Sequence, residues 1–261
     1  MPDPLDVTTD APAALGGRPR KGIARRAARA ALLAALAAAA GLAALLVRPM
    51  VSANVGVVDP GVVIRAAQPT AGLPAMIAEH RLASILNLRG GSPRDPWYDA
   101  EVRTSSDRGV AFYDIPLSAT KRPGRHELLA LIDVLEDCRY PLLIHCKAGA
   151  DRTGLASALY LMVRLGEGPR RASRAFTIYH SHIPLFGPQH LHEPLDEYAA
   201  WLDARGLDHT PGRFRAWVRD EYRSDDPHTE PDRPAPGPRR RGRADAPRTD
   251  IAAKPQSAPR S

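Results

Sequence analysis

Cysteine and aromatic residues are scarce in this chain of 261 residues, which has 2 cysteines and only 5% aromatic residues. Two cysteines are too few for the disulfide framework of a small secreted domain. A short apolar run separates Cys138 from Cys146, and as a strand it holds their Cα atoms roughly 16 Å apart. Because a disulfide needs Cα atoms within about 7 Å, we expect no disulfide. We interpret Cys138 as a packing residue at a helix end.

Basic residues gather near the two ends of the chain. The formal net charge is +7, and basic residues crowd Arg18–Arg29 and Arg239–Arg243. Neither run is interleaved with aromatic side chains. Basic clusters at the chain ends, without aromatic partners, do not make a specific nucleic-acid surface. We therefore expect no nucleic-acid partner.

Charged and polar side chains are absent from Ala30–Val47. As a helix with a rise of about 1.5 Å per residue, this stretch is roughly 27 Å long, just enough to cross the hydrocarbon core of a bilayer. Several arginines and Lys21 precede it, whereas Arg48 alone follows closely. The positive-inside rule then keeps the N-terminus in the cytoplasm and sends the rest of the chain outward.

Two alternatives to an uncleaved anchor remain. Val51-Ser52-Ala53 has the small residues of a signal-cleavage site. A soluble Ala-rich helix is the other alternative, although the stretch has no polar face to present to water. We favour the anchor over the cleaved signal, and both place the following domain outside the cytoplasm.

Composition divides the chain into four segments. We expect residues 1–29 to be a disordered, basic, cytoplasmic N-terminus and 30–47 to be the transmembrane anchor or uncleaved signal. Residues 52–223 carry the apolar pattern of a folded domain. Residues 224–261 are rich in Pro, Arg and Asp with almost no apolar side chains, so this tail cannot bury a core and is expected to be disordered.

Within 52–223, short apolar runs alternate with helix-like stretches. Strands are expected at 55–58, 62–64, 83–88, 110–115 and 142–145, and helices at 71–81, 97–107, 126–136 and 154–165. The remaining pattern is helical, over 169–179, 194–204 and 213–223. This alternation predicts an α/β fold with a central, mainly parallel sheet flanked by helices, preceded by one transmembrane helix.

One loop carries the chemistry of the chain. It joins the last predicted strand to a helix and reads His145-Cys146-Lys147-Ala148-Gly149-Ala150-Asp151-Arg152-Thr153-Gly154. The backbone N–H groups of such a loop can surround an oxyanion, with the positive end of the helix dipole behind it. The same field lowers the pKa of a cysteine. Because the planar guanidinium of Arg152 can bind two oxygens of the anion, the loop indicates phosphoryl transfer to sulfur.

Cys-x5-Arg-Thr-Gly resembles the signature loop of the cysteine-dependent protein tyrosine phosphatases, on the compact dual-specificity side. Ile64-Arg65-Ala66-Ala67-Gln68-Pro69 and Ile85-Leu86-Asn87-Leu88-Arg89-Gly90 are similar to the first strands of a bacterial group that also occurs fused to NAD kinases. The resemblance covers residues 54–205 and implies a tyrosine phosphatase-like fold with no metal and no organic cofactor. With the predicted topology, it places a single-pass enzyme in a bacterial inner membrane, with its catalytic domain in the periplasm.

The resemblance implies a role for each residue of the loop. Cys146 attacks a phosphomonoester and forms a phosphocysteine, which water then hydrolyses. Arg152 and the backbone N–H groups hold the equatorial oxygens, where charge sits in the transition state. Thr153 hydrogen-bonds the sulfur or caps the helix, and His145 orients the loop or is a core histidine. The backbone N–H groups are those of Lys147 to Arg152, and the predicted phosphate-binding residues are Lys147, Ala148, Gly149, Ala150 and Thr153.

The general acid is less well defined. The family usually keeps an Asp on a separate loop upstream of the cysteine, but the expected positions here, Ser118–Lys121, contain no carboxylate. Asp114 has a suitable separation but lies within a predicted strand. Asp151 directly precedes Arg152, an arrangement similar to the myotubularin-type phosphoinositide phosphatases, where that Asp is implicated as the acid. We favour Asp151 over Asp114. A third interpretation, in which Asp151 only orients Arg152 and neither carboxylate is the acid, stays open.

The substrate is open in the same way. Lys147 adds a cation to the predicted pocket, and Cys-Lys-Ala-Gly is similar to the loop of inositol-lipid 3-phosphatases, but Ala150 stands where a second Lys is expected. We predict a protein tyrosine or dual-specificity phosphatase, with a phosphoinositide, lipid or sugar phosphatase as the alternative. Two alternatives belong to another class of function. The first is a rhodanese-like sulfurtransferase, whose loop is typically shorter and lacks Arg-Thr-Gly. The second is a non-catalytic phosphate-binding protein, which would not require both Cys146 and Arg152.

Further polar clusters have weaker interpretations. His180, His182, His190 and His192 crowd one segment, but prolines interrupt it and no cysteine or carboxylate pair completes a metal site. We expect a loop beside the pocket entrance instead. Arg89 is interpreted as a brace for the loop. A solvated helix face, or recruitment of an anionic substrate, is predicted for Arg170, Arg171 and Arg174.

Overall fold

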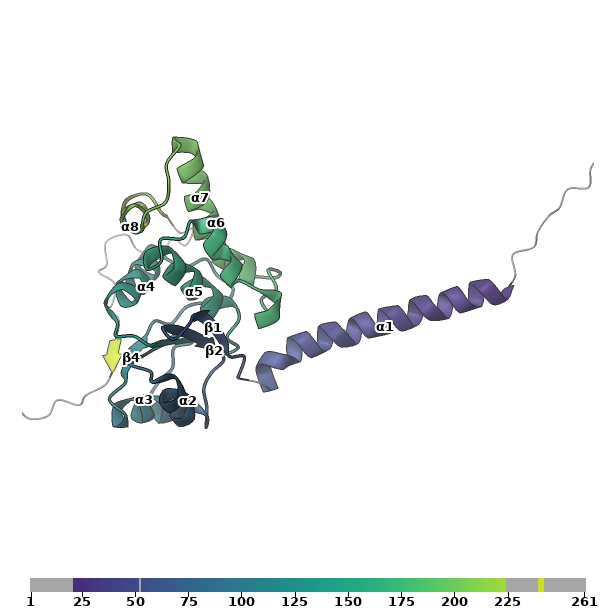
Figure 1. The fold of residues 1–261 in the computed structure, drawn as a ribbon, viewed down its shortest axis with the longest axis horizontal. Helices are drawn as coiled ribbons and strands as arrows, with labels where there is room; N and C mark the ends of the chain where they lie inside the picture. The colour runs from purple at the N-terminus through teal and green to yellow at the C-terminus, as the bar shows by residue number, and fades with distance from the viewer. Residues whose placement is uncertain (1–20, 52, 224–238, 242–261) are drawn as a thin grey trace, which may run out of the picture. The chain divides into compact units, whose positions relative to one another are not determined.

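The structure is a computed structural model that describes residues 21–51, 53–223 and 239–241. The chain divides between Ala44 and Leu45 into two compact units (Figure 1). Each unit is described separately below.

Helix α1 (Lys21–Val51) makes up the described part of the first unit and continues into the second. Its stretch Arg25–Ala44 is long and apolar enough to cross a membrane, and leucines such as Leu33 are exposed. By length and composition α1 is therefore a candidate membrane span. Of the predicted disordered N-terminus, residues 1–20 lie outside the described residues, whereas 21–29 are helical. Ala and Arg are good helix formers and extend the helix toward the N-terminus.

The second unit is built on a six-stranded sheet, as far as the described residues show, with the strand order β1-β2-β5-β3-β4-β6. The central strands β2, β5, β3 and β4 are parallel, and the edge strands β1 and β6 are antiparallel to their neighbours. The prediction of a mainly parallel sheet is confirmed. The strands are β1 (Gly56–Asp59), β2 (Val63–Ala66), β3 (Ser84–Asn87), β4 (Ala111–Asp114), β5 (Leu142–His145) and β6 (Arg239–Arg241).

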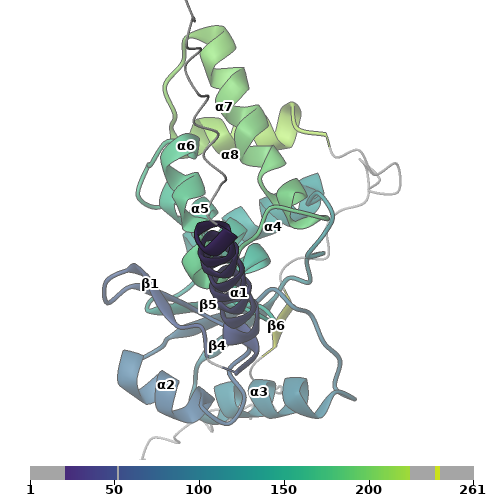
Figure 2. The same cartoon turned by 90° about the vertical axis from the view of Figure 1, so that its right-hand side faces the viewer.

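Helices cover both faces of this sheet, as Figures 1 and 2 show. Two lie on one face: α2 (Leu73–His80) and α3 (Pro96–Asp107). The others lie on the opposite face: α4 (Arg125–Asp137), α5 (Asp151–Val163), α6 (Pro169–Ala172), α7 (Glu193–Arg205) and α8 (Pro211–Asp220). Cys138 follows α4 as its C-cap, where it is buried and free, as expected of a packing residue.

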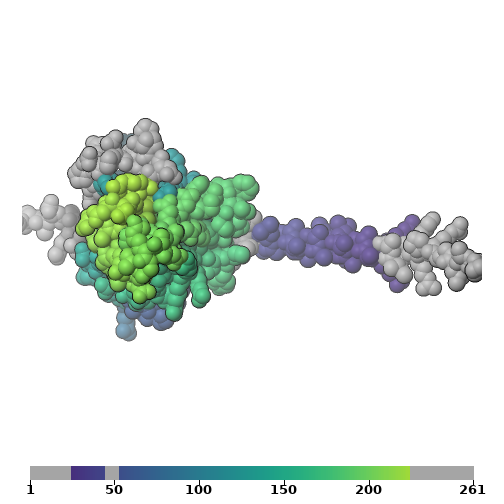
Figure 3. Space-filling model, turned by 90° about the horizontal axis from the view of Figure 1, so that it is seen from above, coloured from purple at the N-terminus to yellow at the C-terminus, as the bar shows by residue number. Residues whose placement is uncertain are grey.

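Alternate side chains of the central strands enter two separate hydrophobic cores. In β5, Leu143 packs into the core beneath α2 and α3, whereas Leu142 and Ile144 pack into the larger core beneath α4, α5, α7 and α8. This period of two is what a strand buried on both faces requires. Figure 3 shows α7 and α8, coloured green to yellow, over the outer side of the larger core. The two cores fix β5, and with it the point where the signature loop begins.

The stretch 169–179, predicted as one helix, is broken. After α6 the chain forms a 3₁₀ turn at Ser173–Ala175 and a second at Ile178–His180. Thr177 lies between them with φ −126° and ψ 143°, and its hydroxyl accepts a hydrogen bond from the N–H of His180 at 3.1 Å. Thr177 therefore starts a new turn instead of continuing the helix, a common alternative for a hydroxyl side chain.

The tail also differs in part from its prediction. Within 224–261, predicted to be disordered, Arg239–Arg241 pairs with β4 as the antiparallel edge strand β6. Residues 224–238 and 242–261 lie outside the described residues. Without β6, the edge of β4 would present unpaired backbone groups to any extended segment. Amino-acid composition carries no information about such pairing.

Candidate active site

Cys146 lies at the carboxyl end of β5, between the last strand residue and the first residue of α5. Its side chain is buried, with the residue 2% exposed, and its Sγ accepts a hydrogen bond from the N–H of Gly149 at 3.3 Å. Gly149 has φ +70°, and a Cβ there would lie 2.6 Å from backbone atoms of Ala66. Only glycine fits this turn without strain or a clash.

Groups outside the signature loop bind its first two carbonyl oxygens. The N–H of Gln68 donates to Lys147 O at 3.2 Å, and Asn54 Nδ2 donates to Ala148 O at 2.8 Å. In a planar trans peptide the next N–H points away from the carbonyl. The N–H groups that follow these two carbonyls therefore face the opposite side, and one of them is the Gly149 N–H that reaches the Cys146 sulfur.

Arg65 of β2 binds the next two carbonyls of the loop. Its Nη2 donates to Gly149 O at 2.8 Å and Ala150 O at 3.1 Å, and its Nη1 donates to Ala175 O at 2.6 Å. The residue is only 3% exposed. Burial lowers the pKa of Arg65 to about 10, while Cys146 and Asp151 act in the opposite direction. Arg65 remains a cation near neutral pH, directly behind the loop.

Arg152 is held by backbone carbonyls at the ends of neighbouring strands. Its Nη1 donates to Leu117 O at 3.2 Å and to Leu88 O at 3.4 Å. Its Nε is buried and has no hydrogen-bond partner among the described residues, and the same is true of Thr153 Oγ1. The guanidinium is thus oriented by two carbonyls while a donor remains for an anion. Lys147, in the loop itself, is exposed.

Asp151 contacts the histidine segment, by which we mean residues 178–192. Its Oδ1 lies 2.8 Å from Nδ1 of His182, and Nε2 of His182 lies 2.6 Å from Nε2 of His192. His182 is 3% exposed, and the ring of His192 stacks on Phe176 with centroids 3.9 Å apart. Burial and the neighbouring His182 lower the pKa of His192. A line of two imidazoles therefore ends at the candidate acid.

The other two histidines of the segment have separate partners. Nδ1 of His180 lies 3.1 Å from Asn54 Oδ1, and Nδ1 of His190 lies 2.6 Å from Glu193 Oε1. No group of three or more His, Cys, Asp or Glu side chains suited to a metal ion occurs in the described part of the chain.

Asp114, the other candidate acid, is the last residue of β4 and is 8% exposed. Asn87 Nδ2 donates to its Oδ1 at 3.1 Å, and the hydroxyl of Tyr98 donates to its Oδ2 at 2.8 Å. Both carboxylate oxygens are therefore engaged by buried donors. This environment suits a structural carboxylate that ties β4 to β3 and α3.

A buried polar chain supports His145 from behind. Its Nε2 lies 2.8 Å from Oε1 of Glu101, outside hydrogen-bonding geometry, and both side chains are fully buried. Gln68 Nε2 donates to the other oxygen of Glu101 at 2.5 Å. Arg89 donates to Gln68 Oε1 at 3.4 Å, and its guanidinium lies 3.8 Å from the ring centroid of Trp97. Arg89 thus reaches the loop through Gln68.

Three further residues contact the loop but are not predicted as site residues from the sequence: Asn54, Arg65 and Glu101. Arg65 alone has a visible signal, because it is a charged residue in the otherwise apolar run Val62-Val63-Ile64-Arg65-Ala66. Asn54 and Glu101 reach the site from distant parts of the chain. Of the predicted arginine face, Arg170 forms an ion pair with Asp203, and Arg171 forms one with Glu167 at 3.3 Å.

Residues 56–181 match the family model described as a DSP-PTPase phosphatase fused to NAD+ kinase. The matched region is that of a cysteine-dependent, tyrosine phosphatase-like phosphatase, and the protein is a phosphoric monoester hydrolase, as the signature loop predicts. No curated protein sequence matches the chain.

Several solved structures are similar to the chain. P. aeruginosa TpbA is 22% identical, with 66% of this chain and 99% of that one covered and a TM-score of 0.41. The core catalytic domain of the PP-IP phosphatase SIW14 from S. cerevisiae is 17% identical, covering 60% and 96%, with a TM-score of 0.44. A putative phosphatase from Neisseria meningitidis is 18% identical, covering 56% and 98%, with a TM-score of 0.42.

Proposed function

We propose that this enzyme hydrolyses phosphorylated proteins, phosphotyrosine foremost, through a phosphocysteine on Cys146. One observation carries the proposal: outside groups bind the loop carbonyls from Lys147 to Ala150, so the N–H groups turn toward the sulfur. Such a cradle matches the equatorial oxygens of a transferring phosphoryl group, where charge sits in the transition state. Arg152 adds a buried donor without a protein partner in the described part.

The first step forms a sulfur–phosphorus bond. The Cys146 thiolate attacks phosphorus in line with the leaving oxygen, and the phosphorus–oxygen bond breaks as the new bond forms. The positive charge of Arg65 lies directly behind the loop, where the reaction brings negative charge. The leaving oxygen takes a proton from the general acid and departs as an alcohol or phenol.

The second step returns the enzyme to its starting state. A water molecule attacks phosphorus and gives its proton to the carboxylate formed in the first step. The sulfur–phosphorus bond breaks, and inorganic phosphate leaves. The Thr153 hydroxyl is buried and without a protein partner in the described part of the chain, so it is available to donate to the departing sulfur and stabilise the thiolate.

We assign the general acid to Asp151. It lies next to Arg152, and its contact with His182 uses Oδ1, which leaves Oδ2 for the leaving group. Asp114 is the weaker candidate because buried donors occupy both of its oxygens.

The His182–His192 pair supports this assignment through its protonation. Burial and the neighbouring His182 lower the pKa of His192, which favours its neutral form, and a neutral His192 has an Nε2–H that it can share with His182. His192 Nε2–H then donates to His182 Nε2, and His182 Nδ1–H donates to Asp151. In this tautomer His182 gives Asp151 a hydrogen bond without placing a positive charge beside it.

The nucleophile is tested by Cys146→Ser. The variant should lose all detectable turnover of phosphopeptides and aryl phosphates, because the hydroxyl is a far weaker nucleophile than the thiolate. Retained turnover would overturn the mechanism. Circular dichroism of the full-length variant provides the folding control.

The acid is tested by comparing Asp151→Asn with Asp114→Asn on good and poor leaving groups. Loss of the acid should cost about 10²-fold or more on an alkyl phosphate and far less on p-nitrophenyl phosphate, whose leaving group needs no proton. We expect this split for Asp151→Asn. For Asp114→Asn we expect a loss of stability with no dependence on the leaving group, and a split there instead would move the assignment to Asp114.

A phosphoinositide, lipid or sugar phosphate is the alternative substrate. The exposed cation of Lys147 favours it, because a second phosphate would gain from a nearby positive charge. Initial rates on a panel of phosphotyrosine peptide, phosphoinositide and sugar phosphate distinguish the two. Lys147→Ala should weaken the binding only of substrates that carry more than one phosphate.

We further propose that α1 anchors the enzyme in a bacterial inner membrane with the catalytic domain outside the cytoplasm. Ala53 O accepts a hydrogen bond from the N–H of Ala67 at 2.7 Å, so the candidate cleavage site adjoins the folded domain. An alkaline phosphatase fusion after residue 223 should be active, and an inactive fusion would contradict export. N-terminal sequencing of the membrane-extracted protein separates the anchor from a cleaved signal.

A further inference from the structure

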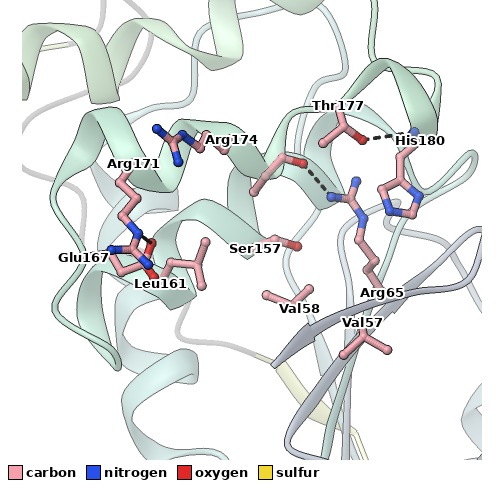
Figure 4. Close-up of a pocket in the computed structure, with 11 residues that line it drawn as sticks. Val57, Val58, Arg65, Ser157, Leu161, Glu167, Arg171, Arg174, Thr177 and His180 are labelled. Atoms are coloured by element: carbon pink, nitrogen blue, oxygen red, sulfur yellow. Dashed lines mark hydrogen bonds and ion pairs between the residues drawn. The ribbon is translucent and has the colours of Figure 1, made fainter. Parts of the chain in front are cut away.

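A cavity of about 310 Å³ lies beside the signature loop, among β1, α5 and α6 (Figure 4). None of the residues 146–152 lines it, so it is distinct from the phosphate cradle. The volume is at the lower end of the range of roughly 300–1,000 Å³ in which small molecules bind.

The walls of this cavity combine an apolar floor with a cationic rim. Val57, Val58 and Leu161 supply the floor, and Arg171 and Arg174 stand on the rim, as Figure 4 shows. The carboxylate of the cavity, Glu167, is already paired with Arg171 at 3.3 Å. Arg174 has no ion pair within the described residues. The walls therefore suit a ligand with an apolar body and a negative charge.

Arg65 forms the inner wall. Among the described residues it makes no ion pair, although Cys146 and Asp151 nearby partly favour its charge. Its hydrogen bonds go to neutral backbone carbonyls, and its Nε is buried without a partner in the described part of the chain. Transfer of a cation out of water is costly unless an anion or enough hydrogen bonds replace the lost solvation. An anion in the cavity would provide part of that compensation.

We propose that this cavity binds a small organic acid and that the bound acid inhibits the phosphatase through Arg65. The same guanidinium lines the cavity and binds the carbonyls of Gly149 and Ala150. Its positive charge attracts the incoming phosphate, and a negative charge on its other side weakens that attraction. The inhibition rests on the proposed function, whereas binding does not.

Binding is measured by calorimetry on the full-length chain in a neutral detergent, with cyclohexanecarboxylate as the probe. Cyclohexanecarboxamide, which has the same body without the charge, should not bind. Arg174→Ala should bind the acid up to about fivefold more weakly, as expected for one exposed ion pair. Arg170→Ala is the matched control, because this neighbouring arginine pairs with Asp203 and does not line the cavity.

The variant Arg152→Met tests whether the acid binds in the cavity or in the active site. This variant disables the phosphate cradle, so acid bound in the cavity should bind it as it binds the wild type. Binding lost in Arg152→Met would place the acid in the active site and overturn the proposal. Equal affinity of the wild type and Arg174→Ala, or equal binding of acid and amide, would also overturn it.

Inhibition is measured with p-nitrophenyl phosphate and with iodoacetamide. At saturation the acid should lower kcat/KM about fivefold, the lower end of usual coupling between sites. It should also slow the alkylation of Cys146 at constant pH. Unchanged kinetics and alkylation with acid bound would overturn the coupling. If the wild type hydrolyses no phosphomonoester, the proposed function fails, while calorimetry and alkylation still decide on the cavity.

Discussion

The signature loop and the histidine segment meet at Asp151, but the fold holds them in opposite ways. Outside groups bind the loop carbonyls from Lys147 to Ala150, and the loop cysteine is buried. In the histidine segment, His182 is buried, whereas Ile178 is 66% and Phe186 is 96% exposed. The loop is thus fixed along its length, while the segment is held at a few points.

This difference separates two tasks of one active site. An oxyanion cradle gains most from donors fixed before the reaction begins, and the loop provides them. The acid must hold a proton in one step and accept one in the next, and Asp151 obtains its partner from a segment of short turns. We therefore expect changes in the loop to affect every substrate, and changes in the segment to affect only the proton transfers.

Gly149→Ala should have the largest effect, because it changes the loop directly. The new Cβ would lie 2.6 Å from the backbone of Ala66 at a φ of +70°. Backbone strain alone costs about 1–3 kcal/mol, and displacement of the N–H donors by about 1 Å can cost 10²-fold in kcat/KM. Urea unfolding and steady-state kinetics on aryl and alkyl phosphates measure both effects.

Gly109→Ala is the matched control for that experiment. Gly109 has a similar φ of +68°, but an added Cβ would meet no atom within 4 Å. This variant should lose about 1–2 kcal/mol of stability from the left-handed conformation alone and keep its kcat/KM. If both variants lost activity equally, close packing behind the loop would not be what fixes it.

Of this architecture, the parts that depend on local pattern are predictable from the sequence. β5 is predicted with the bounds it has, because an apolar run after Pro141 must enter two cores. The stretch 169–179 is predicted wrongly, because its apolar spacing is helical while Thr177 binds the next turn. The sequence around Arg239–Arg241 does not predict a strand, because this strand forms by pairing with the edge of β4.

The site divides in the same way. One sequence motif contains Cys146, Gly149 and Arg152, so the motif alone identifies them. Arg65 and His182 contact the loop only after folding, across 84 and 31 positions of sequence. Charge and polarity of these residues are visible in the sequence, but their partners are not, because hydrogen bonds across the sheet have no periodicity to reveal them.

His182→Leu should have an intermediate effect that is confined to the acid. Removal of the hydrogen bond to Asp151 should cost about tenfold in kcat for an alkyl phosphate, in line with hydrogen bonds to charged groups, and little for p-nitrophenyl phosphate. His182→Asn places an amide N–H near the position of Nδ1 and should restore much of the loss. Equal losses on both leaving groups would show a general structural role for His182.

A smaller effect is expected in the pH dependence of stability. The lowered pKa of His192 means that the unfolded chain binds a proton there more readily than the folded chain. The free energy of unfolding should therefore fall as the pH drops through about 6.5, the ordinary histidine value. The pKa of His209 is also lowered by burial and acts in the same direction. Urea titrations should give a weaker pH dependence of the free energy of unfolding for His192→Gln than for the wild type.

Phe186→Ser should have the smallest effect, and it sharpens the contrast within the histidine segment itself. Phe186 is 96% exposed and has a φ of +60°, so its side chain contributes little to packing, and stability should change by no more than about 0.5 kcal/mol. Turnover of p-nitrophenyl phosphate and of an alkyl phosphate should both stay unchanged, because His182 and Asp151 keep their contact. A slower rate confined to the alkyl phosphate would mean that the exposed tip positions His182. The segment would then act as one rigid body rather than through its buried histidines alone.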